Sequence, residues 1–106
     1  MVRELSPAEF AAQQAAGSDA VLLDVREPWE LAIARLEGTV DVPMAQLAAR
    51  LPELDPSREV VVLCRSGGRS LAVARFLEAR GFRSVANLTG GILAWARDLD
   101  PALATY

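Results

Sequence analysis

The chain contains a single cysteine, Cys64, and its neighbours give it the features of a nucleophile. An apolar run at 60–63 precedes it, and a polar stretch with two glycines, 65–70, follows it. Residues 71–80 then have the pattern of a helix. The amino end of a helix presents unpaired N–H groups that stabilise negative charge. Because the reactive form of cysteine is the thiolate, this position favours a nucleophile over the inert core residue that a lone cysteine commonly is.

The stretch after the cysteine has the composition of an anion-binding loop. Gly67 and Gly68 can adopt backbone angles that other residues avoid, so main-chain N–H groups can approach a bound anion closely. Arg65 and Arg69 add positive charge to the same loop. A free thiol has a pKa of ~8.5, and helix ends and arginine neighbours commonly lower it to ~3.5–7.5. We therefore predict that this loop ionises Cys64.

The absence of histidine and lysine excludes several kinds of catalytic chemistry. The chain has no histidine, and all eleven of its basic residues are arginine. A Cys–His or Ser–His dyad, a histidine-ligated metal and Schiff-base chemistry are therefore excluded, and we expect neither a metal nor a cofactor. The remaining polar groups of the loop are Ser66 and Ser70. We expect both to form hydrogen bonds within the loop, with Ser70 stabilising the cysteine sulfur.

Length and composition indicate one domain, residues 1–106, with a packed core. The chain is 52% hydrophobic and 24% charged, with a formal net charge of −3. An acidic balance does not favour nucleic acid as a partner. No apolar stretch approaches the ~20 residues that span a bilayer, and no signal-peptide pattern begins the chain. We expect a cytoplasmic protein that has no membrane partner.

The elements that position Cys64 follow from local patterns. Helical patterns occupy residues 7–16, 29–35, 44–51, 71–80 and 92–97. Strand patterns occupy residues 20–25, 39–42, 59–63 and 83–88. Residues 98–106 have neither pattern and are expected to form a less ordered tail. This alternation predicts an α/β fold, a mostly parallel sheet with helices on both faces and a reactive site at the carboxyl ends of its strands.

Other residues near the strand ends are candidates for supporting roles. Asp24 ends a predicted strand, where it either orients Arg26 or the loop, or simply caps the structure. Arg26 and Glu27 form either an ion pair near the entrance or a solvated pair of little energetic value. Trp29 lines an acceptor cleft or packs on the surface, whereas Trp95 is expected in the core.

Four segments together resemble the single-domain rhodanese-like sulfurtransferases. They are residues 22–28 (LLDVREP), 61–70 (VVLCRSGGRS), 81–82 with 85–88, and 89–92 with Trp95. The resemblance implies a rhodanese-like three-layer fold and a persulfide mechanism. In that mechanism Cys64 takes the outer sulfur of thiosulfate or a similar donor and passes it to cyanide, a small thiol or a protein thiol. The substrate-binding residues would be Arg65, Ser66, Gly67, Gly68, Arg69 and Ser70.

Loop length separates this chain from similar families. Rhodanese-fold phosphatases and arsenate reductases, which resemble this layout, have a loop with the pattern Cys-x5-Arg. Here Cys64 and Arg69 form the pattern Cys-x4-Arg, a loop one residue shorter that fits a single sulfur atom. Arg65 and Arg69 suit a dianion such as thiosulfate. The alternatives are a persulfide relay between partner proteins, a small phosphatase or arsenate reductase, and a non-catalytic binding domain. Arg35 stands where the family usually has histidine, which affects the entrance and acceptor preference rather than the chemistry.

Overall fold

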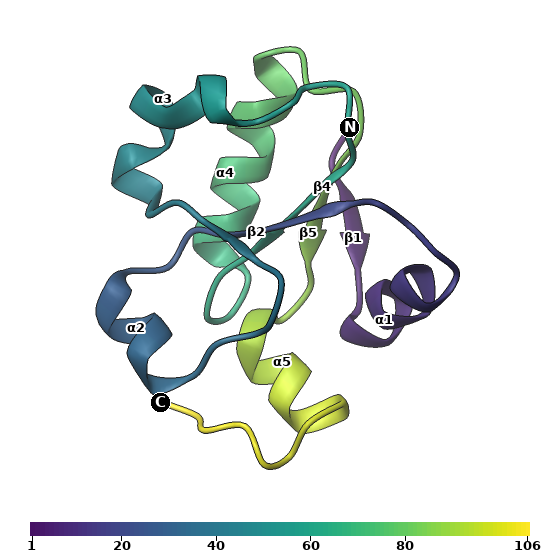
Figure 1. The fold of residues 1–106 in the computed structure, drawn as a ribbon, viewed down its shortest axis with the longest axis vertical. Coiled ribbons are helices and arrows are strands. Elements are labelled where there is room, and N and C mark those ends of the chain that lie inside the picture. The colour runs from purple at the N-terminus through teal and green to yellow at the C-terminus, as the bar shows by residue number, and fades with distance from the viewer.

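A computed structural model describes residues 1–106 and shows a three-layer α/β fold (Figure 1). Five parallel strands form one sheet in the order β1-β5-β4-β2-β3. The strands are β1 (Arg3–Leu5), β2 (Val21–Asp24), β3 (Val40–Asp41), β4 (Val60–Leu63) and β5 (Val85–Leu88). The predicted α/β class and parallel sheet are confirmed. β1 was not predicted, because its three residues contain no apolar run and its partner strand β5 lies at the other end of the chain.

The helices are α1 (Pro7–Ala15), α2 (Pro28–Ile33), α3 (Leu47–Arg50), α4 (Gly68–Ala79) and α5 (Gly91–Asp98). Short 3-10 turns at Met44–Gln46 and Leu51–Glu53 flank α3. Helices α3 and α4 cover one face of the sheet, and α1 and α5 cover the other (Figure 1). No helix has the length and apolar character needed to cross a membrane.

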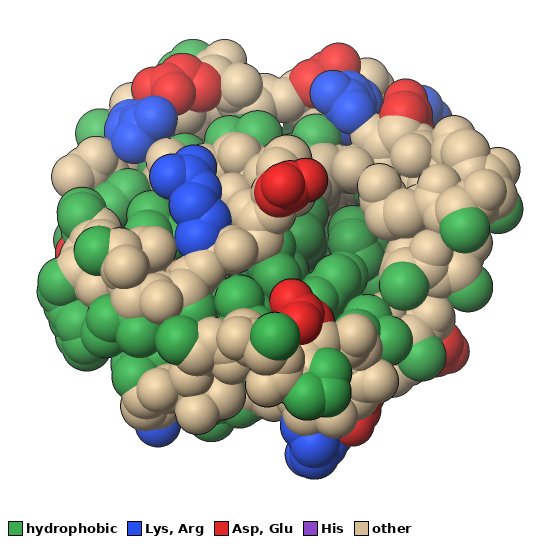
Figure 2. All heavy atoms as spheres, turned by 60° about the horizontal axis from the view of Figure 1, so that its bottom comes forward, with side chains coloured by type: hydrophobic (Ala, Val, Ile, Leu, Met, Phe, Trp, Pro, Cys, Tyr) green, Lys and Arg blue, Asp and Glu red, His purple; other side chains and the backbone are tan.

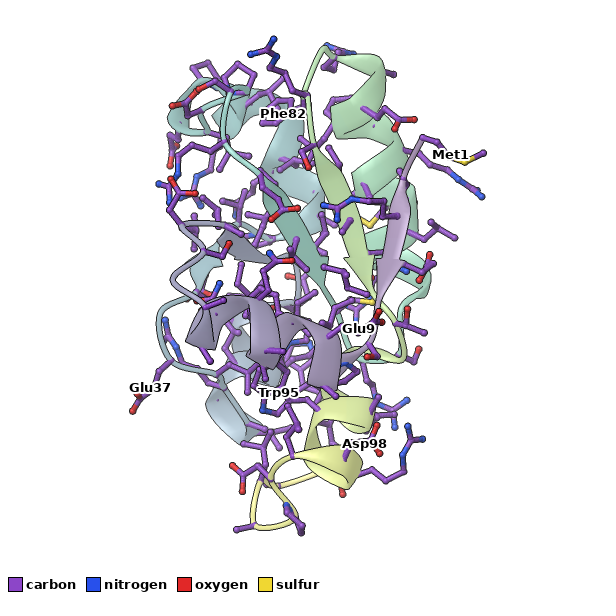
Figure 3. All side chains as sticks on the ribbon, turned by 90° about the vertical axis from the view of Figure 1, so that its right-hand side faces the viewer. Met1, Glu9, Glu37, Phe82, Trp95 and Asp98 are labelled. Atoms are coloured by element: carbon purple, nitrogen blue, oxygen red, sulfur yellow. The ribbon has the colours of Figure 1, made fainter.

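Strand alternation divides the core between the two faces. On β4, Val60 and Val62 belong to the cluster under α4, whereas Val61 and Leu63 belong to the cluster under α5. Successive side chains of a strand point to opposite faces, so a strand covered on both sides must be apolar throughout. The second cluster extends to Trp95, which lies on α5 where that helix meets α1 (Figure 3). Trp95 is partly buried, with its ring centroid 6.0 Å from that of Phe10.

The carboxyl ends of β2 and β4 lie side by side, since Asp24 pairs in register with Leu63. The loop after β4 begins at this edge and lies between α2 and α5 (Figure 1). The segment after α5 was expected to be a less ordered tail, and this expectation was wrong. It runs back to α2 in Figure 1, and Leu103 and Tyr106 pack against the core. The apolar and aromatic side chains of the tail find partners only in the folded chain.

Charged side chains of both signs are scattered over the face of the molecule shown in Figure 2. Hydrophobic side chains lie between them, and no continuous patch of one charge is visible on this face. In the molecule as a whole, several arginines form ion pairs with a carboxylate.

Candidate active site

Cys64 lies directly after β4 and before α4, with only 1% of its surface exposed. Its sulfur nevertheless has polar neighbours. The backbone N–H of Gly67 donates to Sγ across 3.1 Å, and Sγ lies 3.2 Å from the hydroxyl oxygen of Ser70. The cysteine therefore sits at the floor of the loop, within reach of hydrogen-bond donors, although its other side packs in the core.

The surroundings of Cys64 act in opposite directions on its pKa. Burial raises the pKa of the thiol, because a charged sulfur loses its solvation. Hydrogen bonds from the Ser70 hydroxyl and from the N–H groups of Ser70, Gly67 and Ser66 lower it, and the net pKa lies below the ordinary value. The loop thus favours the thiolate through amides and a hydroxyl. No arginine forms a hydrogen bond with the sulfur, so the predicted contribution of arginine is limited to the nearby charge of Arg69.

The amino end of α5 holds the loop in place, and Gly91 permits the close approach. The N–H groups of Ile92 and Leu93 donate to the carbonyl oxygens of Cys64 and Arg65, at 2.9 and 3.1 Å. Gly91 has a φ of +60°, and a Cβ on it would lie 2.4 Å from the Cys64 carbonyl oxygen. Only glycine permits this approach. Since α5 takes up these carbonyl groups, the N–H groups of the loop are left to face the sulfur.

Arg69 is paired with a buried carboxylate that the sequence did not single out. Its guanidinium donates to both oxygens of Glu30, at 2.6 and 2.8 Å. Hydrogen bonds from Arg69 hold the pKa of Glu30 to about 2, well below its usual 4.5, and outweigh the opposing effect of burial. The pKa of Arg69 is raised, first by Glu30, and the charge of Cys64 contributes to the same shift. Arg69 therefore stays within electrostatic reach of the sulfur while its hydrogen bonds serve Glu30.

Arg65 points toward the end of the chain rather than toward the sulfur. Its guanidinium donates to the backbone oxygen of Tyr106 and lies 5.2 Å from the centre of that ring. Trp29 is 62% exposed and meets the Tyr106 ring edge-on. A surface depression of about 580 Å³ lies beside the loop; its lining residues are Glu27, Trp29, Glu30, Arg65, Arg69 and Tyr106.

Asp24 and Arg26 form a fully buried ion pair. The Asp24 carboxylate accepts from Nε and Nη2 of Arg26, at distances between 2.8 and 3.1 Å. Arg26 also donates to the Ala34 carbonyl oxygen and to the Tyr106 hydroxyl. The suggested pair of Arg26 with Glu27 is wrong, because a guanidinium with no solvent needs a buried partner of opposite charge. Asp24 both ends β2, where its Oδ1 accepts from the Arg26 backbone N–H at 3.1 Å, and binds the Arg26 guanidinium; its supporting role at the site stays a prediction.

The ion pair of Asp24 and Arg26 is connected to the active-site loop only through the side chains of Tyr106 and Glu30. The Tyr106 hydroxyl accepts from Arg26 and donates to Glu30, which in turn binds Arg69. Sequence reasoning missed Glu30 and Tyr106, and neither carries a local signal. It also missed Asn87, although a polar residue between the apolar residues Ala86 and Leu88 of a predicted strand is such a signal.

Two further predicted residues can be placed. Gly68 is the first residue of α4, with ordinary backbone angles, and Gly67 just before it has a φ of +106°. Arg35 forms an exposed ion pair with Asp41 and lines a different surface depression from the one beside the loop. Arg35 therefore lies away from the depression beside the loop, and its effect on acceptor preference stays a prediction.

Residues 6–98 match the family described as the Rhodanese-like domain, and the chain belongs to that family. The resemblance noted in the sequence is thereby confirmed. A protein of Allochromatium vinosum named Sulfurtransferase is 36% identical over 104 residues, covering 98% of this chain and 97% of that protein. The Rhodanese-like/PpiC domain-containing protein 12 of Arabidopsis thaliana is 45% identical over 92 residues. That match covers 83% of this chain but 31% of the longer plant protein.

A solved structure gives the same result for the fold. A rhodanese-related protein of Thermoplasma volcanium is similar with a TM-score of 0.83 and 28% identity. The similarity covers 92% of this chain and 93% of the other. The three-layer arrangement around the sheet is therefore that of the family.

Proposed function

We propose that this chain is a sulfurtransferase that carries sulfane sulfur as a persulfide on Cys64. The main observation that supports this proposal is the position of the Cys64 Sγ at the amino end of α4, 3.1 Å from the Gly67 nitrogen and 3.2 Å from the Ser70 hydroxyl. Such donors stabilise an anionic sulfur. Membership of the rhodanese-like family and the similarity to a protein named Sulfurtransferase support the same chemistry.

In the first half-reaction the Cys64 thiolate attacks the outer sulfur of thiosulfate. A bond forms between Sγ and that sulfur, the original sulfur–sulfur bond breaks, and sulfite leaves with the electron pair. The product is a Cys64 persulfide whose outer sulfur carries the negative charge. No proton or external oxidant is required once the thiol is ionised.

In the second half-reaction an acceptor removes the outer sulfur. Cyanide, a small thiolate or a protein thiolate attacks it, and the bond to Sγ breaks in favour of the Cys64 thiolate. The products are thiocyanate or a new persulfide, together with the original enzyme. Two half-reactions that share one covalent intermediate give ping-pong kinetics.

The loop residues have separate parts in this scheme. The N–H groups of Ser66, Gly67 and Ser70 stabilise the sulfur anion in both states. Gly68 lies at the start of α4 with open space around its Cβ position, so it has no contact that assigns it a part in the reaction. Arg65 and Arg69 attract the anionic donor through the guanidinium N–H groups that their present partners leave unused.

A persulfide relay is the second candidate function, and one observation favours it. Both loop arginines already have partners, Arg69 in Glu30 and Arg65 in Tyr106. The Glu30 carboxylate offsets the charge of Arg69 and so weakens the attraction for a dianion such as thiosulfate, whereas a persulfide on a partner protein carries a single charge. Cys64 would receive and deliver sulfur in the same way in both functions.

Mass spectrometry after incubation with thiosulfate tests the proposal. The expected result is a gain of one sulfur atom on Cys64, removed by cyanide and absent in Cys64→Ser. Sulfur loading that is slow from thiosulfate but fast from a persulfidated protein would assign the relay. Hydrolysis of an aryl phosphate without any sulfur loading would refute both functions and assign a phosphatase.

A further inference from the structure

Asn87 is a polar residue on the interior strand β5, and only 4% of its surface is exposed. Both the nitrogen and the oxygen of its side-chain amide have hydrogen-bond partners. Nδ2 donates to the Glu4 carboxylate, at 3.2 and 3.3 Å, and to the Gly67 carbonyl oxygen, at 3.2 Å. Oδ1 accepts from the Ser70 hydroxyl at 2.5 Å. Asn87 thus contacts Gly67 and Ser70, two of the residues whose groups donate to the Cys64 sulfur.

The partners fix the orientation of this amide. The Glu4 carboxylate and the Gly67 carbonyl can only accept hydrogen bonds, so the nitrogen must face them and Oδ1 must face Ser70. A hydroxyl has one hydrogen, and here Ser70 gives it to Asn87. The Ser70 oxygen is then an acceptor toward Cys64, which donates its S–H. This pattern of hydrogen bonds is that of the neutral thiol.

Ionisation of Cys64 changes the role of the hydroxyl. A thiolate has no hydrogen to donate and accepts instead, so the Ser70 hydrogen turns from Asn87 to the sulfur. Asn87 Oδ1 then loses a buried hydrogen bond, which costs free energy. We propose that Asn87 is a positioning residue that sets the protonation state of Cys64 by competing with its sulfur for the Ser70 hydroxyl hydrogen. This deepens the proposed function, on which it rests for the role of Cys64 as the reacting group.

The charged groups around Cys64 do not take the place of the Ser70 hydroxyl as hydrogen-bond partners of the sulfur. Arg69 is the cation whose pKa responds to Cys64, and it is paired with Glu30. Arg65 points to Tyr106, and Asp24 on the neighbouring strand is paired with Arg26. Glu4, on the far side of Asn87, binds the amide nitrogen. None of these groups forms a hydrogen bond with the sulfur, so the hydroxyl and the loop amides act on it directly.

A double-mutant cycle tests the inference by measuring the ionisation of Cys64 without any sulfur donor. The four proteins are the natural chain, Ser70→Ala, Asn87→Leu and the double variant. The rate of alkylation by iodoacetamide against pH gives the pKa of Cys64, and no other cysteine contributes to the signal. Failure of this test leaves the sulfur-loading experiment unaffected, so the inference and the proposed function fail separately.

Ser70→Ala is expected to raise the pKa of Cys64, because the thiolate loses a donor. Asn87→Leu removes the competing acceptor, so the Ser70 hydroxyl is free to donate to the sulfur and the thiolate is favoured. The increase in the thiolate-to-thiol ratio should be larger in the natural background than in Ser70→Ala, by up to about tenfold. Any loosening of Gly67 affects both backgrounds and cancels in the comparison.

An equal effect of Asn87→Leu in both backgrounds, or a larger gain of thiolate in Ser70→Ala, would overturn the inference. Asn87→Ala removes the same acceptor without adding bulk, and it replaces Asn87→Leu in the cycle if the latter does not fold.

Discussion

Gly91→Ala tests how α5 holds the active-site loop. The residue has a φ of +60°, which costs a residue with a Cβ about 1–2 kcal/mol. The added carbon would lie 2.4 Å from the Cys64 carbonyl oxygen and 2.5 Å from the carbonyl carbon and oxygen of Arg65. These are backbone atoms, so the loop itself must move, and forced repacking of this kind typically costs about 1–3 kcal/mol more. We expect a total loss of about 2–5 kcal/mol.

The same movement should disturb the sulfur. The N–H groups of Ile92 and Leu93 would lose the carbonyl oxygens that they bind, and the Gly67 N–H would shift from Sγ. We therefore expect the pKa of Cys64 to rise in Gly91→Ala, along with the loss of stability. Urea denaturation gives the free energy of unfolding, and alkylation against pH gives the pKa of the thiol.

Gly38→Ala is the matched control. Gly38 has a similar φ of +74°, but no heavy atom lies within 4 Å of its Cβ position. It should show the backbone cost of about 1–2 kcal/mol and no change at Cys64. Equal losses of stability in the two variants, with an unchanged thiol pKa in Gly91→Ala, would refute the role assigned to the contact between α5 and the loop.

Three further predictions concern the polar network behind the loop. Glu30 has a pKa of about 2, so the contribution of its ionised carboxylate to stability is complete above about pH 4.5 and is lost as the pH falls toward 2. Between pH 5 and 2.5 the natural chain should therefore lose more stability than Glu30→Gln, as measured by urea denaturation. Arg26→Met should cost about 3–5 kcal/mol by the same measurement, because it leaves the buried Asp24 carboxylate unpaired. Tyr106→Phe should cost about 1 kcal/mol through the lost contacts with Arg26 and Glu30.

Each of these predictions has an outcome that contradicts it. Parallel acid profiles for the natural chain and Glu30→Gln would show that Arg69 does not lower the pKa of Glu30 in the folded chain. Arg26→Met should regain stability when Asp24→Asn is added, and no recovery would contradict the unpaired-charge explanation. An unchanged free energy of unfolding in Tyr106→Phe would mean that the hydrogen bonds of the Tyr106 hydroxyl in the folded chain are no more favourable than those it forms with water in the unfolded chain.

The tail illustrates why part of this site was not predictable. Residues 98–106 have no periodic pattern, yet Tyr106 binds Arg26, 80 positions earlier in the chain. Glu30 likewise gave no local sign that it would face Arg69, 39 positions later. Such pairs depend on which loops meet at one edge of the sheet. The pairing of Arg26 with Asp24 rather than Glu27 was decided by burial, which removes the solvent that would otherwise satisfy the charge.

The sequence by itself determined the alternation of strands and helices, the place of Cys64 at the end of β4 and the glycine turns before α4 and α5. These features depend on local periodicity and backbone freedom, which neighbouring residues encode. Only the tertiary structure decided which carboxylates take up the arginines and that Asn87 contacts Ser70. Those contacts join segments distant in the chain, and their geometry exists only once the parallel sheet brings the strand ends together.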